Sequence, residues 1–260
     1  MECGKVISVS SVKGGVGKTT LLLNLAGVYQ MLKKKVLIID FDLYSGGVST
    51  LLNLGNKKDV FMLIDSISNN RFTNIDDYVT HYNSSIDVLA GPKDPRLASK
   101  IESNYIPMVL NLSKSKYDVI LVDTNHTLDA NNLMIFDNSF MTLFVITNDL
   151  VNLKNMKSLM SIFKDLDKKN YMIALNNSRD TGKDFLSMYD IRSIIKCNVD
   201  YVISKNFYIK NIDKYVLKGE ILTLNKTIVN FHMRDYEIMK KMALDLISDS
   251  HKEIVVVKDE

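Results

Sequence analysis

Short runs of apolar, mostly β-branched residues recur along the chain, and stretches with helical spacing of apolar residues fill most of the gaps. Near-continuous apolar runs such as Val119-Ile120-Leu121-Val122 are typical of strands that are covered on both faces. This alternation predicts a doubly wound α/β fold: a mostly parallel sheet with helices on both faces. The predicted strands cover residues 5–11, 35–40, 86–90, 118–123, 140–147, 171–176 and 199–203.

A glycine-rich segment joins the first predicted strand to the first predicted helix. It reads Lys13-Gly14-Gly15-Val16-Gly17-Lys18-Thr19-Thr20. Glycines let successive backbone N–H groups point at phosphate oxygens, and the following helix adds the positive end of its dipole. Lys18 would reach the terminal phosphates, and the Thr19 hydroxyl would ligate Mg²⁺. The strict pattern Gly-x-x-x-x-Gly-Lys-Thr is not met, because Val12 holds its first glycine position. The prediction of a phosphate site therefore depends on strand, loop, Lys-Thr pair and helix coinciding.

Acidic residues close two of the predicted strands. Asp40 and Asp42 follow one apolar run, and Asp123 follows another. In an open parallel sheet, ligands bind beyond the carboxyl ends of the strands. Carboxylates at these ends are suited to hold Mg²⁺ through water or to orient an attacking water. Any one of them alone would be read as the ordinary polar exit of a strand, so the neighbouring glycine-rich segment favours the functional interpretation.

The octapeptide Lys13–Thr20 resembles the deviant Walker motif of the ParA/MinD ATPases, which have the P-loop NTPase fold of the SIMIBI type. The resemblance extends from Val6 to about Leu246, and its specific parts are the octapeptide, the Asp-x-Asp pair and the strand that ends in Asp123. It implies that residues 1–260 form a single P-loop ATPase domain. It also implies ATP and Mg²⁺ as ligands, slow hydrolysis stimulated by a partner, and a homodimer in the ATP state.

The resemblance implies a catalytic set of Lys13, Lys18 and Asp42. Lys13 would reach across the dimer to the partner's nucleotide, and Asp42 would position the nucleophilic water. A second cation near the γ-phosphate would offset charge that develops during phosphoryl transfer. The alternative for Lys13 is an ordinary solvated lysine.

The same resemblance implies a metal set of Thr19, Asp40 and Asp123 around Mg²⁺. Asn176, at the end of a predicted strand, matches the residue that contacts the adenine edge. An amide both donates and accepts hydrogen bonds, as adenine requires. A strand-terminating Asn is also a common turn former, so both interpretations of Asn176 stay open.

The loop after Asp123 departs from the family pattern. The family generally continues with one or two prolines, whereas this chain reads Thr124-Asn125-His126-Thr127-Leu128-Asp129. Without proline we expect a more mobile loop and slower hydrolysis. His126 is interpreted as an ordinary loop histidine rather than a catalytic base, because phosphoryl transfer needs positioning more than proton abstraction.

Composition limits the remaining classes. The 260 residues are 46% hydrophobic and carry a formal net charge of +3, which is mild for a nucleic-acid-binding protein. Cys3 and Cys197 are the only cysteines, which argues against a disulfide framework and against the iron–sulfur reductases that share this fold. No apolar run approaches the length of a membrane span, so we expect a cytoplasmic protein without a transmembrane segment.

The C-terminal third is locally basic. Such an excess is either a solvated face or a contact with an acidic partner, such as DNA or anionic lipid. An apolar stripe over residues 233–246 is expected to pack on the protein's own core, and the acidic end of residues 253–260 argues against a lipid-anchoring helix. The basic residues are Lys205, Lys210, Lys214, Lys218, Lys226, Arg234, Lys240 and Lys241.

Three functions remain. The leading one is an ATPase that positions a cellular assembly together with a protein partner. Within the family, Leu43–Ser49 and Leu89–Pro95 are similar to the TadZ/CpaE branch, which implies localisation of a Tad-type pilus and recruitment to a pole or membrane. The alternatives are a ParA-like partition ATPase that binds nucleoid DNA non-specifically and a scaffold that binds ATP without hydrolysing it.

Overall fold

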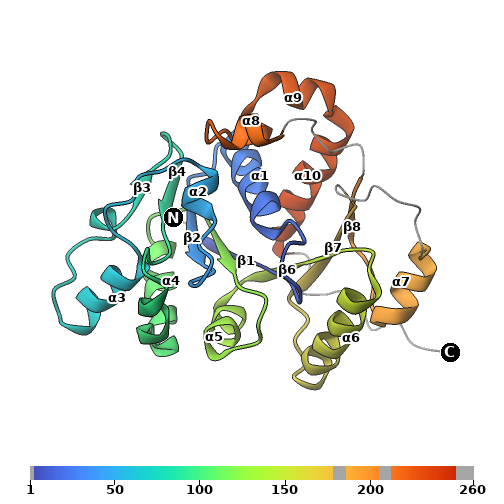
Figure 1. Ribbon diagram of the computed structural model, residues 1–260, viewed down its shortest axis with the longest axis horizontal. Coiled ribbons are helices and arrows are strands. Elements are labelled where there is room, and N and C mark those ends of the chain that lie inside the picture. The colour runs from blue at the N-terminus through green and yellow to red at the C-terminus, as the bar shows by residue number, and fades with distance from the viewer. Residues whose placement is uncertain (1–2, 178–185, 205–211, 250–260) are drawn as a thin grey trace.

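The computed structural model describes residues 3–177, 186–204 and 212–249 (Figure 1). Their strands form one eight-stranded sheet in the order β3-β4-β2-β5-β1-β6-β7-β8. All neighbouring strands are parallel except β3 and β4. The strands are β1 (Lys5–Ser10), β2 (Val36–Phe41), β3 (Thr80–His81), β4 (Ile86–Leu89), β5 (Val119–Thr124), β6 (Met141–Ile146), β7 (Tyr171–Asn176) and β8 (Tyr201–Ile203).

Helices cover both faces of this sheet, which confirms the predicted doubly wound α/β fold. One hydrophobic core lies between the sheet and α3 to α7, and a second lies between the opposite face and α1 and α10 (Figure 1). The helices are α1 (Lys18–Met31), α2 (Val48–Leu51), α3 (Val60–Ser68), α4 (Ile106–Lys114), α5 (Ala130–Asn138), α6 (Leu150–Asp165), α7 (Met188–Ile195), α8 (Ile212–Val216), α9 (Lys226–Phe231) and α10 (Met233–Leu246).

All seven predicted strands are present, and the sequence pattern missed β3. This strand has two residues and pairs antiparallel with β4 at the edge of the sheet, with His81 opposite Asp87. Asp87 is buried in β4 and accepts hydrogen bonds from the Tyr117 hydroxyl at 2.7 Å and from Nδ1 of His81 at 2.5 Å. Two residues are too few for an apolar period to be visible.

The apolar stripe of α10 packs onto the protein's own core, as predicted. Met239, Met242 and Leu246 are buried, and the Tyr29 hydroxyl of α1 donates a hydrogen bond of 2.7 Å to the carbonyl of Ala243. This bond satisfies a phenol that would otherwise be buried without a partner. The pairing of α1 with α10 thus holds the first helix, and with it the glycine-rich loop at its N-terminus, against the sheet.

No helix in the described ranges is long and apolar enough to cross a membrane. The predictions for residues 253–260, and for Lys205 and Lys210, lie outside the described residues.

Candidate functional site

The glycine-rich loop connects β1 to α1 at the carboxyl edge of the sheet. Gly15 and Gly17 have φ values of 77° and 88°, a left-handed conformation that glycine adopts without strain. A Cβ on Gly17 would lie 2.5 Å from Nδ2 of Asn176, and that Nδ2 donates a hydrogen bond of 2.8 Å to the carbonyl of Val16. Asn176 therefore anchors the loop to β7, while its contact with adenine stays a prediction.

Lys18, Thr19 and Asp123 form a connected group next to this loop. Asp123 accepts one hydrogen bond of 2.7 Å from Nζ of Lys18 and one of 2.7 Å from Oγ1 of Thr19. Asp123 is fully buried, and Lys18 is 8% exposed. Burial raises the pKa of Asp123, although the Lys18 charge and the two hydrogen bonds oppose this shift. The group thus places a cation, a hydroxyl and a carboxylate where a phosphate–metal pair would bind.

Asp40 lies beside Asp123, because the two residues are register partners in β2 and β5. Its carboxylate accepts hydrogen bonds from the backbone N–H groups of Asp42 at 3.1 Å and Val48 at 3.2 Å. Burial, together with the negative charge of Asp123, raises the pKa of Asp40 to about 7. Two buried carboxylates side by side are costly without a cation, so this pair suits a divalent metal.

Asp42 lies at the rim of the site and is partly exposed. Its backbone carbonyl accepts from Ser45 and Gly46, which closes a turn, whereas its negative charge acts on both Asp40 and Asp123. The structure therefore brings all three predicted carboxylates to one edge. A side chain at the solvent-facing rim is suited to contact a water, as its predicted role requires.

Mg²⁺ fits the oxygen donors found here. Oγ1 of Thr19 and Oδ2 of Asp123 are in direct contact. Mg²⁺ is usually held by one or two protein oxygens together with phosphates and water. Thr19 and Asp123 would hold the ion, and Asp40 would complete the outer shell. Bound there, the ion would neutralise phosphate charge.

Lys13 lies at the start of the loop, and its Nζ pairs with Asp149 at 3.2 Å. Both side chains are exposed, at 47% and 36%, so this ion pair is weak. Asp149 also caps α6 through Asn152 N. The sequence analysis missed Asp149, which comes three residues after the end of the apolar strand β6. Like Asp123 near the end of β5, it is an acidic residue at the carboxyl end of a buried strand. Lys13 thus has a partner in its own chain that it must leave to reach a second subunit.

The loop after Asp123 is held by hydrogen bonds rather than by proline. Oδ1 of Asn125 accepts from the backbone N–H of Thr127 at 2.8 Å and from Nδ2 of Asn132 at 2.7 Å. Asn125 also donates to Asp129 at 3.0 Å, and Asp129 caps α5. Asn125 thus ties the loop to the start of α5, while the expected mobility and slower hydrolysis stay predictions. The sequence signal was Asn-x-Thr-x-Asp before a helix, a turn-and-cap pattern.

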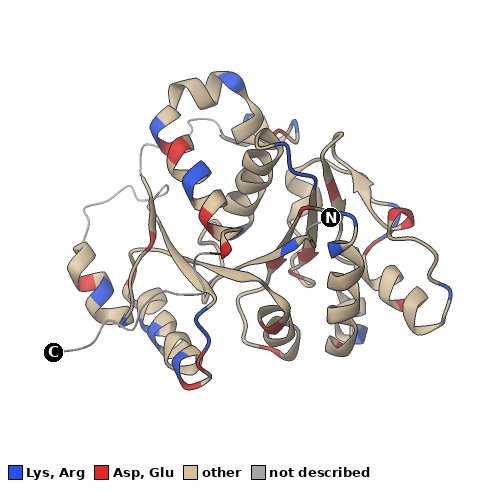
Figure 2. Cartoon of the chain, turned by 180° about the vertical axis from the view of Figure 1, so that it is seen from behind, with Lys and Arg blue, Asp and Glu red and all other residues tan. Residues whose placement is uncertain are grey.

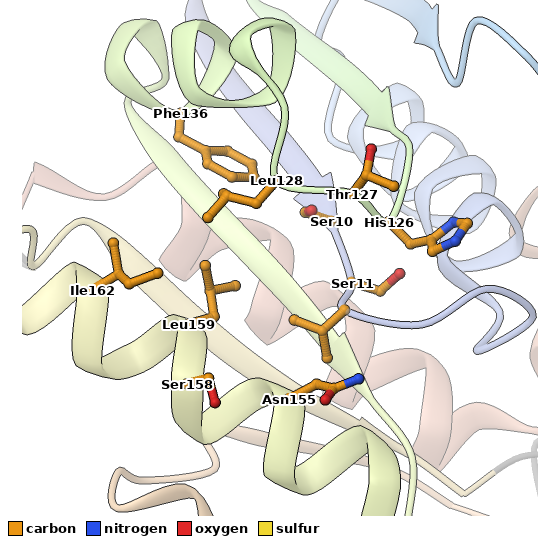
Figure 3. A pocket seen from close by; sticks show the side chains of 11 residues that line it. Ser10, Ser11, His126, Thr127, Leu128, Phe136, Asn155, Ser158, Leu159 and Ile162 are labelled. Carbon is orange, nitrogen blue, oxygen red and sulfur yellow. The ribbon is translucent and has the colours of Figure 1, made fainter.

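A cavity of about 260 Å³ separates this loop from α6 (Figure 3). Leu128 and Phe136 point into it from the side of the loop and α5, and Leu159 and Ile162 line it from α6. His126 also lines the cavity, with its ring turned away from these apolar side chains. The six-residue loop therefore contacts two different surroundings, one apolar and one next to the glycine-rich segment.

A family model described as an AAA domain matches residues 4–178, more than half of the chain. The glycine-rich loop, Lys18 and Asp123 fall within the matched range, so both the motif and its partner across the sheet are covered. The chain belongs to this family.

Two curated relatives of this chain are a MinD protein and a Soj ATPase. The chain is 27% identical over 159 residues to the septum site-determining protein MinD of Helicobacter pylori, covering 60% of this chain and 58% of the relative. It is 29% identical over 199 residues to the chromosome-partitioning ATPase Soj of Treponema pallidum, covering 73% and 74%. The match to MinD thus spans little more than half of that relative's length.

Solved structures support the fold over nearly the whole chain. A ParA family ATPase from Chlorobium tepidum has a TM-score of 0.76 at 21% identity, covering 92% of this chain and 98% of that one. MinD of Pyrococcus horikoshii, solved with Mg-ADP, has a TM-score of 0.75 at 19% identity, covering 95% and 97%. Together with the relatives, these matches support the ParA/MinD group; they do not single out the TadZ/CpaE branch.

Proposed function

We propose that this protein is an ATP-dependent, dimerising ATPase that positions a cellular assembly through a protein partner. The observation that carries the proposal is the contact of Asp123 with both Lys18 and Thr19, next to the glycine-rich loop. These are the groups that a triphosphate and its magnesium need at their β- and γ-phosphates. In this proposal residues 1–260 act as a single P-loop ATPase domain in the cytoplasm.

The proposed chemistry is slow hydrolysis of ATP to ADP and phosphate. A water oxygen would attack the γ-phosphorus, and the bond to the β–γ bridging oxygen would break. Asp42, at the rim, would orient the water, and Lys18 would hold the phosphates. Lys13 would leave Asp149 and contact the nucleotide of a second subunit, which links ATP occupancy to dimerisation. Hydrolysis would return the dimer to monomers.

The decisive experiment measures the mass of the protein in solution with Mg-ATP, with Mg-ADP and without nucleotide. Of these three conditions, we expect a doubled mass only with Mg-ATP. In Lys13→Ala we expect the mass with Mg-ATP to stay that of the monomer. Lys164→Ala is the matched control, because Lys164 is an exposed lysine in the last turn of α6 and should leave the dimer intact. A monomer under all three conditions, with nucleotide bound, would exclude dimerisation. A lack of nucleotide binding by calorimetry would exclude the whole proposal.

The finer proposal is a role in localising a Tad-type pilus, with recruitment to a pole or membrane by a partner. It is supported by the similarity of Leu43–Ser49 and Leu89–Pro95 to the TadZ/CpaE branch. Both segments adjoin Asp40: an added Cβ on Gly91 would lie 3.4 Å from the Asp40 carbonyl, and the two segments line a polar cavity of about 450 Å³. Co-purification with pilus-assembly proteins in the ATP state would test this role, and capture only of unrelated proteins would contradict it.

The second candidate is a DNA-partition ATPase, which the similarity to Soj favours. Exposed basic residues of the described C-terminal third include Lys214, Lys226 and Arg234. Figure 2 shows basic and acidic positions interspersed along α10, which weakens a continuous basic surface. DNA binding that needs ATP and falls steeply with salt would support this candidate, and salt-independent or absent binding would exclude it.

A scaffold that binds ATP without turnover would be distinguished by single-turnover kinetics. A stoichiometric burst of phosphate excludes the scaffold, and bound ATP without phosphate release excludes the ATPase.

A further inference from the structure

The polar cavity of about 450 Å³ beside Asp40, here called the Asp40 cavity, lies at the carboxyl ends of β2 and β4. Its walls come from Asp40, from parts of residues 43–56, which include α2, and from residues 91–95 after β4. Its volume is in the range of small-molecule sites. Crevices at the carboxyl ends of parallel strands are where ligands bind in open sheets.

Asn56 brings a buried acceptor to this cavity. The residue lines the cavity and is only 7% exposed. Its Nδ2 donates to the Ser49 hydroxyl, whereas its Oδ1 has no hydrogen-bond partner in the described part of the chain. A buried carbonyl oxygen without a donor is unfavourable. This oxygen is therefore suited to accept a hydrogen bond from a ligand in the cavity.

Asp40 adds a carboxylate to the same wall. Each of its oxygens accepts one backbone N–H group, which leaves each a further acceptor position. Glycines keep the carboxylate uncovered: a Cβ on Gly91 would lie 3.6 Å from its Cγ, and a Cβ on Gly46 would lie 3.9 Å from its Oδ2. The negative charges of Asp42 and Asp123 act on the same group. A cation with N–H donors is therefore favoured at this wall.

Lys93 supplies the opposite charge at the rim. Among the residues that line the Asp40 cavity it is the only basic one. It is exposed and has no acidic partner among the described residues. Asn56 and Asp40, which are buried, thus favour a cationic group inside the cavity, and Lys93 favours an anionic group at its mouth. A zwitterion carries both groups in one small molecule.

We propose that the Asp40 cavity binds a free amino acid, with its ammonium group at Asn56 and Asp40 and its carboxylate at Lys93. This site goes beyond the proposed function, because its occupation needs no nucleotide. Asp40 is shared with the expected magnesium shell, and a Cβ on Gly47 would lie 3.9 Å from Cγ2 of Thr19. An ammonium group and Mg²⁺ on this edge would repel each other. Amino acid and Mg-nucleotide would therefore weaken each other's binding, and this coupling alone rests on the proposed function.

Calorimetry of the nucleotide-free protein, with a chelator present, tests each standard amino acid as a probe. We expect binding of at least one, and binding of its N-acetyl derivative, which lacks the ammonium group, to be at least about tenfold weaker. The carboxamide derivative, which lacks the carboxylate, should also bind about tenfold more weakly to the wild type. In Lys93→Ala the amino acid and its carboxamide should bind alike. Lys57→Ala is the matched control, because Lys57 is exposed and does not line the cavity.

Asn56→Leu removes the unpaired acceptor and should lower the affinity for the amino acid at least about tenfold. Urea melts establish that each variant folds; should Asn56→Leu not fold, Lys93→Ala decides, because its side chain is exposed. Three results would overturn the inference: no binding of any amino acid, equal affinity for the N-acetyl derivative, or unchanged binding in either folded variant. A protein that binds an amino acid but no nucleotide would retain this inference and lose the proposed function.

Discussion

Replacement of Asp40 by Asn should make the nucleotide-free protein at least as stable as the wild type at high pH, and less stable at low pH. Asp40 is 1% exposed, and burial together with the Asp123 charge raises its pKa from 3.8 to about 7. In the unfolded chain this carboxyl is ionised at pH 5, whereas in the folded protein it keeps its proton until about pH 7. A raised carboxyl pKa means that folding stability is lost as the pH rises from the unfolded-state pKa of 3.8 to the folded-state pKa of about 7.

The magnitude follows from the same two pKa values. Each pH unit between 5 and 7 costs the folded wild type about 1.4 kcal/mol, so roughly 3 kcal/mol of relative stability separates pH 5 from pH 8. A second effect is independent of pH: Asn has one acceptor oxygen, and one of the two N–H groups of Asp42 and Val48 loses its partner. That loss costs about 1–3 kcal/mol. The variant should therefore be less stable than the wild type at pH 5 and equal or more stable at pH 8.

Urea unfolding of both proteins at pH 5 and pH 8, with a chelator and without nucleotide, measures this difference. Asp137→Asn is the matched control, because Asp137 is half exposed. The difference in free energy of unfolding between this variant and the wild type should be the same at both pH values. A gap for Asp40→Asn that does not change with pH would refute the raised pKa. If Asp40→Asn gained stability relative to the wild type as the pH falls, the direction of the argument would be refuted.

Three further predictions concern other contacts. Asp123→Ala leaves the buried Lys18 ammonium without its carboxylate and should lower the free energy of unfolding by about 3 kcal/mol in urea melts; a change below 1 kcal/mol would contradict the pairing. Lys13→Ala breaks only an exposed pair with Asp149 and should change unfolding by less than about 1 kcal/mol; a larger change would give Lys13 a structural role. Asn125→Ala removes the acceptor of several donors and should cost about 2 kcal/mol, with faster amide exchange in residues 124–129; unchanged exchange would mean that Asn125 does not hold the loop.

Much of the fold was accessible from local pattern. Buried parallel strands leave continuous apolar runs, and all seven such runs became strands of the sheet. Strand β3 escaped because two residues are too few to show an apolar period, and its pairing with β4 depends on polar contacts such as that of His81 with Asp87. The phosphate loop was also readable, since strand, glycines, Lys18 and helix follow each other within a few residues.

The sequence by itself determined the doubly wound sheet, the glycine-rich loop and the acidic strand ends, because each depends on neighbours along the chain. Only the tertiary structure decided what these groups touch. The Lys18–Asp123 contact joins residues 105 positions apart, and the Lys13–Asp149 pair joins residues 136 apart. Strand order sets such contacts, and no local pattern encodes it. The same reason applies to the Asp40 cavity: Asp40 and Lys93 line it together because β2 and β4 are neighbours, which no residue near either position reveals.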